Sequence, residues 1–245
     1  MSLTALESGA VHIWAASLAD PRWSARTLRP LLSADELARA SRLKLPLQRQ
    51  RFEVSRGLLR SILSEYLDTP PDRIAFTYGS HGKPALRDHA LHFSVAHSDD
   101  LAVYAIARDR EVGIDVEAIR EIEGIRAIVD RFFTLPEMIE LTKLPPRLHA
   151  EAFANCWTRK EAYLKATGLG CSHPLDQVCV SLAPGTPAQL KWVANRPAES
   201  GRWSLAAFRP AGNHIAAIAV EGPAADLIHH QWPASWNAEQ SKEPS

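Results

Sequence analysis

The sequence predicts an α/β (α+β) protein built from two similar halves, because helical segments precede a run of strands twice along the chain. The halves are expected to cover residues 1–111 and 112–222, and residues 223–245 form a tail without periodicity. Of the 245 residues, 46% are hydrophobic and 23% are charged, which is enough to bury a core. We therefore expect a cleft between the two halves.

The first half is expected to begin with a strand over Val11–Leu18. Ser33 precedes a helix that starts at Ala34, and Glu36 stands where it can complete a capping box. A longer helix over Leu47–Tyr66 ends before a Pro-Pro pair, which cannot continue it. The strands expected next cover Ile74–Tyr78, Leu91–Ala96, Leu101–Ala107 and Gly113–Glu117.

The second half repeats this order. Its helices are expected over Ile125–Phe133, Pro136–Leu141 and Arg147–Thr167, and its strands over Val178–Leu182, Leu190–Val193, Trp203–Phe208 and Ile215–Val220. The tail closes with Glu-Gln-Ser-Lys-Glu-Pro-Ser, which is too polar to pack and is expected to be disordered.

The charge balance limits the classes of partner. Basic and acidic side chains number 28 each, whereas a general nucleic-acid or membrane binder needs a basic excess. No apolar stretch is long enough to span a bilayer, and the N-terminus has no signal-peptide pattern. The cysteines Cys156, Cys171 and Cys179 lack metal-ligand spacing and are expected to be reduced thiols in a cytoplasmic protein.

The stretch Val112-Gly-Ile-Asp-Val-Glu117 places two carboxylates on one face of a strand. Ile114 and Val116 alternate with Asp115 and Glu117, so the apolar pair and the acidic pair point in opposite directions. One interpretation is an edge strand with a solvated acidic face. The other is a divalent cation, because oxygen ligands suit Mg²⁺ and a cation removes the repulsion between the acids.

A second group of charged residues lies in the helix of the segment FANCWTRKEAYLKATGLG, which ends at its glycines. Phe153, Trp157 and Leu164 form its inward stripe, and Lys160, Glu161 and Lys165 lie within that stripe or beside it. Glu161 and Lys165 could be an ordinary surface pair at i,i+4 spacing. Their position beside the apolar stripe instead favours a third carboxylate for the cation, with two lysines for an anion.

Further basic side chains are candidate anion contacts. Arg49, Arg56 and Arg60 share one face of the long first helix with Arg51 beside them, although a solvated basic face is the simpler interpretation. Lys83 lies in the turn Gly79-Ser-His-Gly-Lys-Pro84, where a rigid backbone can present an ammonium to phosphate. His97 ends a strand, where binding residues are frequent, although a lone histidine is more often structural.

In order and spacing these motifs resemble the Sfp-type 4′-phosphopantetheinyl transferases. The motifs that carry the resemblance are HGKPAL, FSVAHS, VGIDVE and WTRKEAYLKATGLG, and the match runs from about Leu31 to Leu182. The resemblance implies a pseudo-two-fold monomer that binds coenzyme A between its halves. It also implies transfer of the phosphopantetheine arm to a serine of an acyl, peptidyl or aryl carrier protein, with release of adenosine 3′,5′-bisphosphate.

The resemblance also assigns roles residue by residue. Asp115, Glu117 and Glu161 resemble the Mg²⁺ ligands, and Lys165 the lysine beside the pyrophosphate. The residues that resemble coenzyme A contacts are Arg51, Gly82, Lys83, Pro84, Ser94, Ala96, His97, Asp115 and Lys165. The family often has Asn and Ser where this chain has Ser94 and Ala96, and its basic residues before the long helix are placed differently from Arg42 and Lys44.

Attack on a pyrophosphate needs charge neutralisation more than covalent chemistry from the protein. Glu161 could accept the serine proton, but a metal-bound carboxylate is a poor base, so metal ligation is the preferred role. Two other functions fit the same residues: a Mg²⁺-dependent phosphohydrolase, and a non-catalytic module that binds coenzyme A or a carrier protein. The motifs HxxxD, GxSxG, HExxH and GxGxxG are absent.

Overall fold

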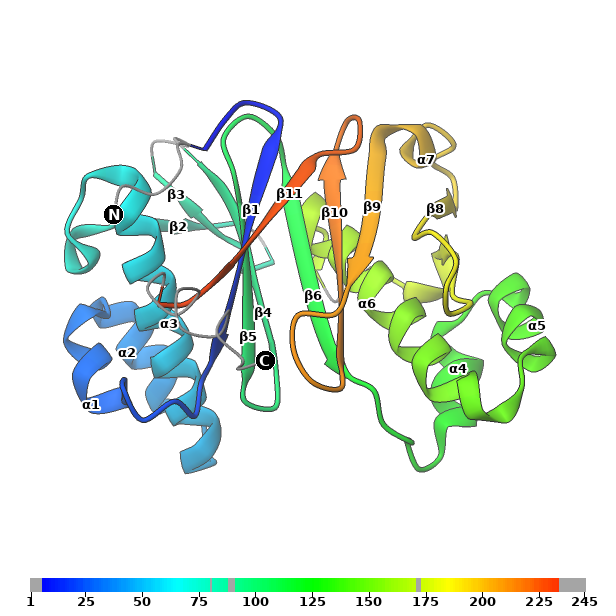
Figure 1. Ribbon diagram of the computed structural model, residues 1–245, viewed down its shortest axis with the longest axis horizontal. Coiled ribbons are helices and arrows are strands. Elements are labelled where there is room, and N and C mark those ends of the chain that lie inside the picture. The colour runs from blue at the N-terminus through cyan, green and yellow to red at the C-terminus, as the bar shows by residue number, and fades with distance from the viewer. Residues whose placement is uncertain (1–5, 80, 88–90, 171–172, 234–245) are drawn as a thin grey trace, which may run out of the picture.

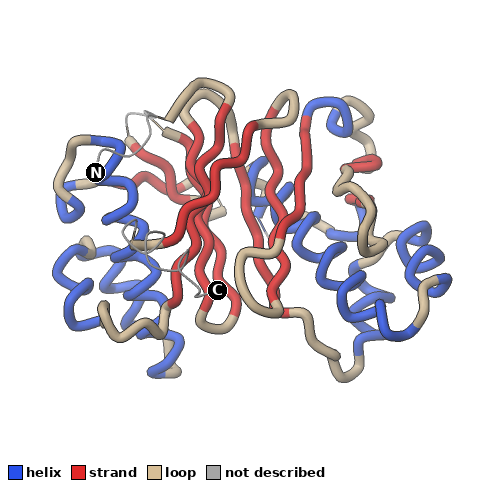
Figure 2. The backbone as a smooth tube through the Cα atoms, in the orientation of Figure 1, coloured by secondary structure: helices blue, strands red, loops and turns tan. Residues whose placement is uncertain are grey.

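A computed structural model describes residues 6–79, 81–87, 91–170 and 173–233 of the protein. Its layers follow the order helix, sheet, sheet, helix, with the strands in the centre and helices on both flanks (Figures 1 and 2). The first sheet has the strand order β11-β1-β5-β4 and the second has the order β6-β10-β9. None of the described helices combines the length and the apolar character that a bilayer span needs.

The first half contains three α-helices and five strands among its described residues. They are β1 (Ala10–Ser17), α1 (Ala25–Leu28), α2 (Ala34–Ser41), α3 (Pro46–Leu67), β2 (Phe76–Tyr78), β3 (Pro84–Leu86), β4 (His92–Ser98) and β5 (Leu101–Ala107). The predicted capping box is confirmed, since the Ser33 backbone N–H donates to Glu36 Oε2 at 3.0 Å. Glu36 also accepts from buried Arg60 Nε at 2.8 Å. Arg60 is therefore a buried structural residue. The predictions that it lies on a solvated face or binds an anion are both wrong.

The rest of the described chain supplies the second sheet and its helices, together with one strand that returns to the first sheet. The elements are β6 (Val112–Ala118), α4 (Ile125–Phe132), α5 (Leu135–Lys143), α6 (His149–Thr167), β7 (Val178–Val180), β8 (Leu190–Val193), α7 (Glu199–Arg202), β9 (Trp203–Phe208), β10 (His214–Glu221) and β11 (Asp226–Gln231).

Three apolar clusters bind the layers together. Helix α3 packs Leu59 and Ile62 against the outer face of the first sheet. The facing sides of the two sheets share a core to which both contribute, including Val103 and Ile114. Helices α4 to α6 cover the outer face of the second sheet. Each sheet thus carries one long helix on its outer face, α3 on the first sheet and α6 on the second (Figure 1).

Two serines of β4 join the sheets where their edge strands meet. Ser94 Oγ accepts the backbone N–H of Ile114 at 3.1 Å, and Ser98 Oγ accepts that of Ala118 at 3.2 Å. Both contacts have the same offset of 20 residues, so β4 and β6 run parallel in a fixed register. Side chains, rather than a backbone ladder, therefore hold this seam.

Helix α6 lies directly against β6 because of Gly113. A Cβ atom on Gly113 would stand 2.1 Å from the carbonyl oxygen of Ala162 and 2.2 Å from the Ala166 nitrogen. Only glycine allows this approach of helix to strand. The residues two and four positions along β6 then face α6, which brings Asp115 and Glu117 toward the helix.

The segment over residues 223–245, predicted to be a tail without periodicity, contains a strand at Asp226–Gln231. This strand, β11, pairs in parallel with β1 and stacks His230 on Trp14 at a ring-centroid distance of 4.4 Å. Its sequence, DLIHHQ, shows too little apolar alternation to predict a strand. Residues 234–245, where disorder was expected, lie outside the described residues, as do Ser80 and Cys171.

Candidate functional site

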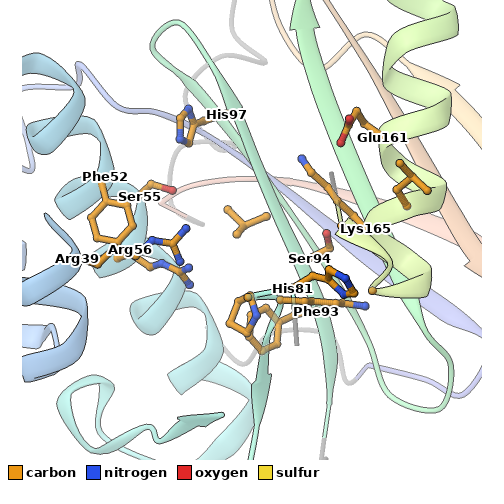
Figure 3. Close-up of a pocket in the computed structure, with 17 residues that line it drawn as sticks. Arg39, Phe52, Ser55, Arg56, His81, Phe93, Ser94, His97, Glu161 and Lys165 are labelled. Carbon is orange, nitrogen blue, oxygen red and sulfur yellow. The ribbon is translucent and has the colours of Figure 1, made fainter. Parts of the chain in front are cut away.

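A pocket of about 300 Å³ opens between the two halves (Figure 3). One wall comes from α2 and α3, the floor from β4 and the turn before β3, and the opposite wall from the C-terminal half of α6. The residues that line it are Arg39, Phe52, Ser55, Arg56, His81, Gly82, Lys83, Pro84, Phe93, Ser94, Val95, His97, Glu161, Leu164, Lys165, Gly168 and Gly170.

The acids that the sequence singled out come together where α6 meets β6, and one of them, Glu161, lines the pocket. Lys165 Nζ donates to Asp115 Oδ1 at 2.6 Å, and Glu161 faces the pocket one helical turn away. Glu117 Oε2 accepts from Ser98 Oγ at 2.9 Å. The other oxygen of Asp115, Oδ2, is buried and finds no hydrogen-bond partner within the described chain.

The environment raises the pKa of each of these three carboxyl groups. Burial raises the pKa of Asp115, against the opposing charge of Lys165. Burial and then the charge of Asp115 raise the pKa of Glu117. The same two causes raise the pKa of Glu161, and Glu117 adds to the effect. The three carboxylates therefore repel one another across the β6–α6 contact, which is the situation that a cation relieves.

The opposite wall is basic. Arg39 and Arg56 each hold a guanidinium carbon 5.6 Å from the ring centre of Phe52, and both point into the pocket in Figure 3. Arg56 is buried, and its Nη1 has no partner among the residues that the structure describes. Burial, then the charges of Lys165, Arg51 and Arg56, lower the pKa of His97. A free guanidinium aimed into a pocket fits an anionic ligand such as a phosphate.

Comparison with known proteins agrees with this chemistry. A family model described as the 4′-phosphopantetheinyl transferase superfamily matches residues 111–219. The 4′-phosphopantetheinyl transferase HetI of Nostoc sp. is 41% identical over 221 residues, which cover 89% of this chain and 90% of that protein. The chain belongs to the 4′-phosphopantetheinyl transferase superfamily. The resemblance seen in the motifs is thus confirmed, as is the expectation of an enzyme.

Other members of the superfamily match less of the chain. The 4′-phosphopantetheinyl transferase psf-1 of Bacillus pumilus is 33% identical over 67% of this chain and 70% of its own length. The crystal structure of Helicobacter pylori holo-[acyl-carrier-protein] synthase in complex with coenzyme A aligns with 45% of this chain and 99% of its own. That alignment has 19% identity and a TM-score of 0.35.

Within this phosphopantetheinyl transferase, Lys83 occupies an unexpected position. Its Nζ donates to Glu111 Oε2 at 2.8 Å and to the carbonyl oxygens of Val112 and Ala166 at 3.3 and 3.0 Å. The ammonium therefore links the turn before β3 to β6 and α6. Lys83 lines the pocket together with the neighbouring Gly82 and Pro84, and their contacts with coenzyme A stay predictions.

Among the residues singled out from the sequence, the described lining of the pocket does not include Asp115, Glu117, Arg51, Ala96 or Lys160. Arg51 pairs with Asp100 at 2.9 Å, and Ala96 is buried in the core between the sheets. Lys160 was expected to bind an anion, but it is buried against Glu137 at 2.6 Å and donates to two backbone carbonyls. That expectation is wrong, because the apolar stripe carries Lys160 into the core.

The sequence alone missed much of the basic wall. Arg39 lies in α2 with no motif around it. The sequence pattern groups Arg56 with Arg49 and Arg60, but of these three arginines only Arg56 lines the pocket. Arg49 Nη2 donates to the carbonyl oxygen of Leu43 at 3.1 Å. The available signal was the spacing of Phe52 and Arg56, which places a ring and a guanidinium on one face of α3.

Proposed function

We propose that this protein transfers the 4′-phosphopantetheine arm of coenzyme A to a serine of an acyl, peptidyl or aryl carrier protein. The reaction depends on Mg²⁺ and releases adenosine 3′,5′-bisphosphate. The observation that carries the proposal is the acidic row of Asp115, Glu117 and Glu161 with Lys165. Glu161 and Lys165 line the pocket opposite Arg39 and Arg56, and Lys165 is paired with buried Asp115. A nucleotide diphosphate ester needs both kinds of contact at once.

The acidic residues fit a divalent cation. Asp115 offers a buried oxygen without a partner, and carboxylates with raised pKa values gain most from a nearby positive charge. Asp115, Glu117 and Glu161 are the residues that would hold Mg²⁺, although no group of three metal-binding side chains among the described residues is already arranged as a site. In the structure the ammonium of Lys165 pairs with Asp115, within the group of three acids. Bound Mg²⁺ supplies charge neutralisation on the pyrophosphate oxygens.

The side chains around the pocket have separate tasks in this proposal. Lys165 can turn from Asp115 to a phosphate oxygen, because its side chain remains about one-third exposed (31%). Arg39, Arg56 and His97 hold the phosphates at the nucleotide end. Positioning the carrier serine in line with the phosphorus leaves little else for the protein to do.

The carrier protein is proposed to dock beside this site. A smaller groove lies next to Glu117, lined by Ile122, Ile128, Phe153 and Trp157. Exposed Arg126 lies on the neighbouring helix α4, as does Arg131. An acidic carrier protein with an apolar contact surface complements such a face. The proposal includes a cytoplasmic monomer that binds neither nucleic acid nor membrane, in keeping with its zero net charge.

Mass spectrometry tests the reaction class directly. An apo carrier protein incubated with this protein, coenzyme A and Mg²⁺ should gain the mass of one phosphopantetheine. A phosphohydrolase would consume the nucleotide without modifying the carrier, and a non-catalytic module would leave both unchanged. Either of these results would contradict the proposal.

A further inference from the structure

The contacts of Ser98 connect the seam between the sheets to the acidic row. Ser98 is buried at the end of β4, with 7% of its surface exposed. Its Oγ accepts the Ala118 N–H at 3.2 Å and donates to Glu117 Oε2 at 2.9 Å. A hydroxyl has one proton, so a hydroxyl that accepts the backbone N–H keeps that proton for the carboxylate.

Glu117 needs such a partner. It lies two residues from Asp115 on the same face of β6, and the two carboxylates repel each other. A free Glu117 side chain would rotate away from Asp115 toward the solvent-exposed groove that it also lines. The bond from Ser98 holds Oε2 against the seam, two residues from Asp115 on the same face of β6.

We infer that Ser98 is a positioning residue that aims the Glu117 carboxylate at the cation expected in this site. The inference rests on the proposed function, because it concerns the same cation. Groups that orient metal ligands commonly change metal affinity by about 10- to 100-fold when they are removed. Ser98 meets that description through one hydrogen bond to the carboxylate and one to the strand that carries it.

Titration of Mn²⁺, in the presence of saturating coenzyme A and without a carrier protein, measures this role without turnover. Ser98→Ala should weaken Mn²⁺ binding by about tenfold, and Ser98→Thr, which retains the hydroxyl, should recover most of that loss. Ser204→Ala is the matched control. Ser204 lies in β9, the other edge strand of the second sheet, and its hydroxyl donates to the carbonyl oxygen of Gly222 at 2.6 Å. The Mn²⁺ affinity of the Ser204→Ala variant should therefore equal that of the wild type.

A double-mutant cycle separates positioning from general destabilisation. If Ser98 acts through Glu117, Ser98→Ala should have little further effect on Mn²⁺ affinity in a Glu117→Gln background. An undiminished effect in that background would overturn the inference, and so would wild-type Mn²⁺ affinity in Ser98→Ala. Absence of Mn²⁺ binding by the wild type would instead overturn the metal part of the proposed function, and the role of Ser98 with it.

Discussion

At the scale of single residues, the strongest physical signal is the repulsion among Asp115, Glu117 and Glu161. Each carboxyl group has a raised pKa, so its protonated form favours the fold. The stability that this contributes is fully present below the unfolded-state pKa and is lost as the pH rises through the folded-state pKa. At neutral pH the row therefore destabilises the metal-free protein.

Neutralising one acid should show this cost. Glu161→Gln is expected to raise the thermal midpoint of the protein at pH 7 in EDTA and to leave it unchanged near pH 3, where wild-type Glu161 is itself protonated. Differential scanning calorimetry at the two pH values measures the difference.

Glu161→Gln and Asp115→Ala should each lose Mg²⁺-dependent transfer while remaining folded. Near-wild-type transfer in either variant would refute the metal assignment.

Lys165 should contribute to the reaction rather than to the fold. Lys165→Ala is expected to cost roughly 2–4 kcal/mol of transition-state stabilisation, as is typical for loss of one electrostatic donor. Steady-state kcat/KM with a carrier protein gives that figure. A harmless substitution would leave Lys165 as a partner of Asp115 with no part in the reaction.

At the scale of elements, the contact between α6 and β6 depends on Gly113. Gly113→Ala would place a methyl group 2.1 Å from a helix backbone oxygen, so the helix has to move. We expect a loss of about 3 kcal/mol or more in the free energy of unfolding, measured by urea denaturation, together with loss of transfer because Glu161 and Lys165 move too. Gly201→Ala, which meets nothing within 4 Å, is the control.

The β1–β11 pair should respond to acid. His12 on β1 is buried, and its Nδ1 and Trp14 Nε1 both lie 2.8 Å from the Tyr66 hydroxyl oxygen. Burial, then the charge of His230 on β11, lower the pKa of His12 to about 4. The unfolded chain binds the proton near pH 6.5, so the folded state loses stability as the pH falls from 6.5 toward 4.

A shift of that size amounts to about 3 kcal/mol over the pH window. Urea denaturation at pH 7 and pH 4.5 should record most of this loss in the wild type and much less in His12→Gln. His229 and His230 also have pKa values lowered by burial, so some acid sensitivity should remain. Equal pH dependence in both proteins would show that His12 does not control it.

At the scale of the whole molecule, the sequence predicted the elements better than their partners. Strand periodicity located β5, β8 and β9 with their observed ends, and the glycine after Thr167 ended α6 as expected. The order of the motifs also predicted that Asp115, Glu117, Glu161 and Lys165 lie close together. In contrast, α2 and α3 meet the pocket through tertiary packing, which no local pattern around Arg39 reveals.

Burial explains the remaining errors. In the sequence Arg60 looks like a surface cation and Lys160 like an anion contact. Each is instead paired with a buried acid far away in the chain, Glu36 and Glu137 respectively. An ion pair of this kind follows from the folded core, not from residue spacing. Lys83 also has acceptors far away in the chain, Glu111 and the carbonyl oxygen of Ala166, but it lines the pocket and its contact with coenzyme A stays a prediction.

The face that carries α4 should determine recognition of the carrier protein. Reversal of charge at Arg126 or Arg131 to Glu is expected to raise the carrier KM several-fold with little change in kcat, because a rim charge acts mainly on encounter. Arg87→Glu, an exposed change in the first half, is the control. An unchanged carrier KM in the α4 variants would exclude this docking face.

The parallel pairing of β11 with β1 has a consequence for biosynthesis. While the ribosome is still translating the second half, the outer edge of β1 has no neighbour, because residues 226–231 have yet to emerge. An uncovered strand edge invites pairing with other nascent chains. The N-terminal sheet therefore keeps an unpaired edge until residues 226–231 have been translated.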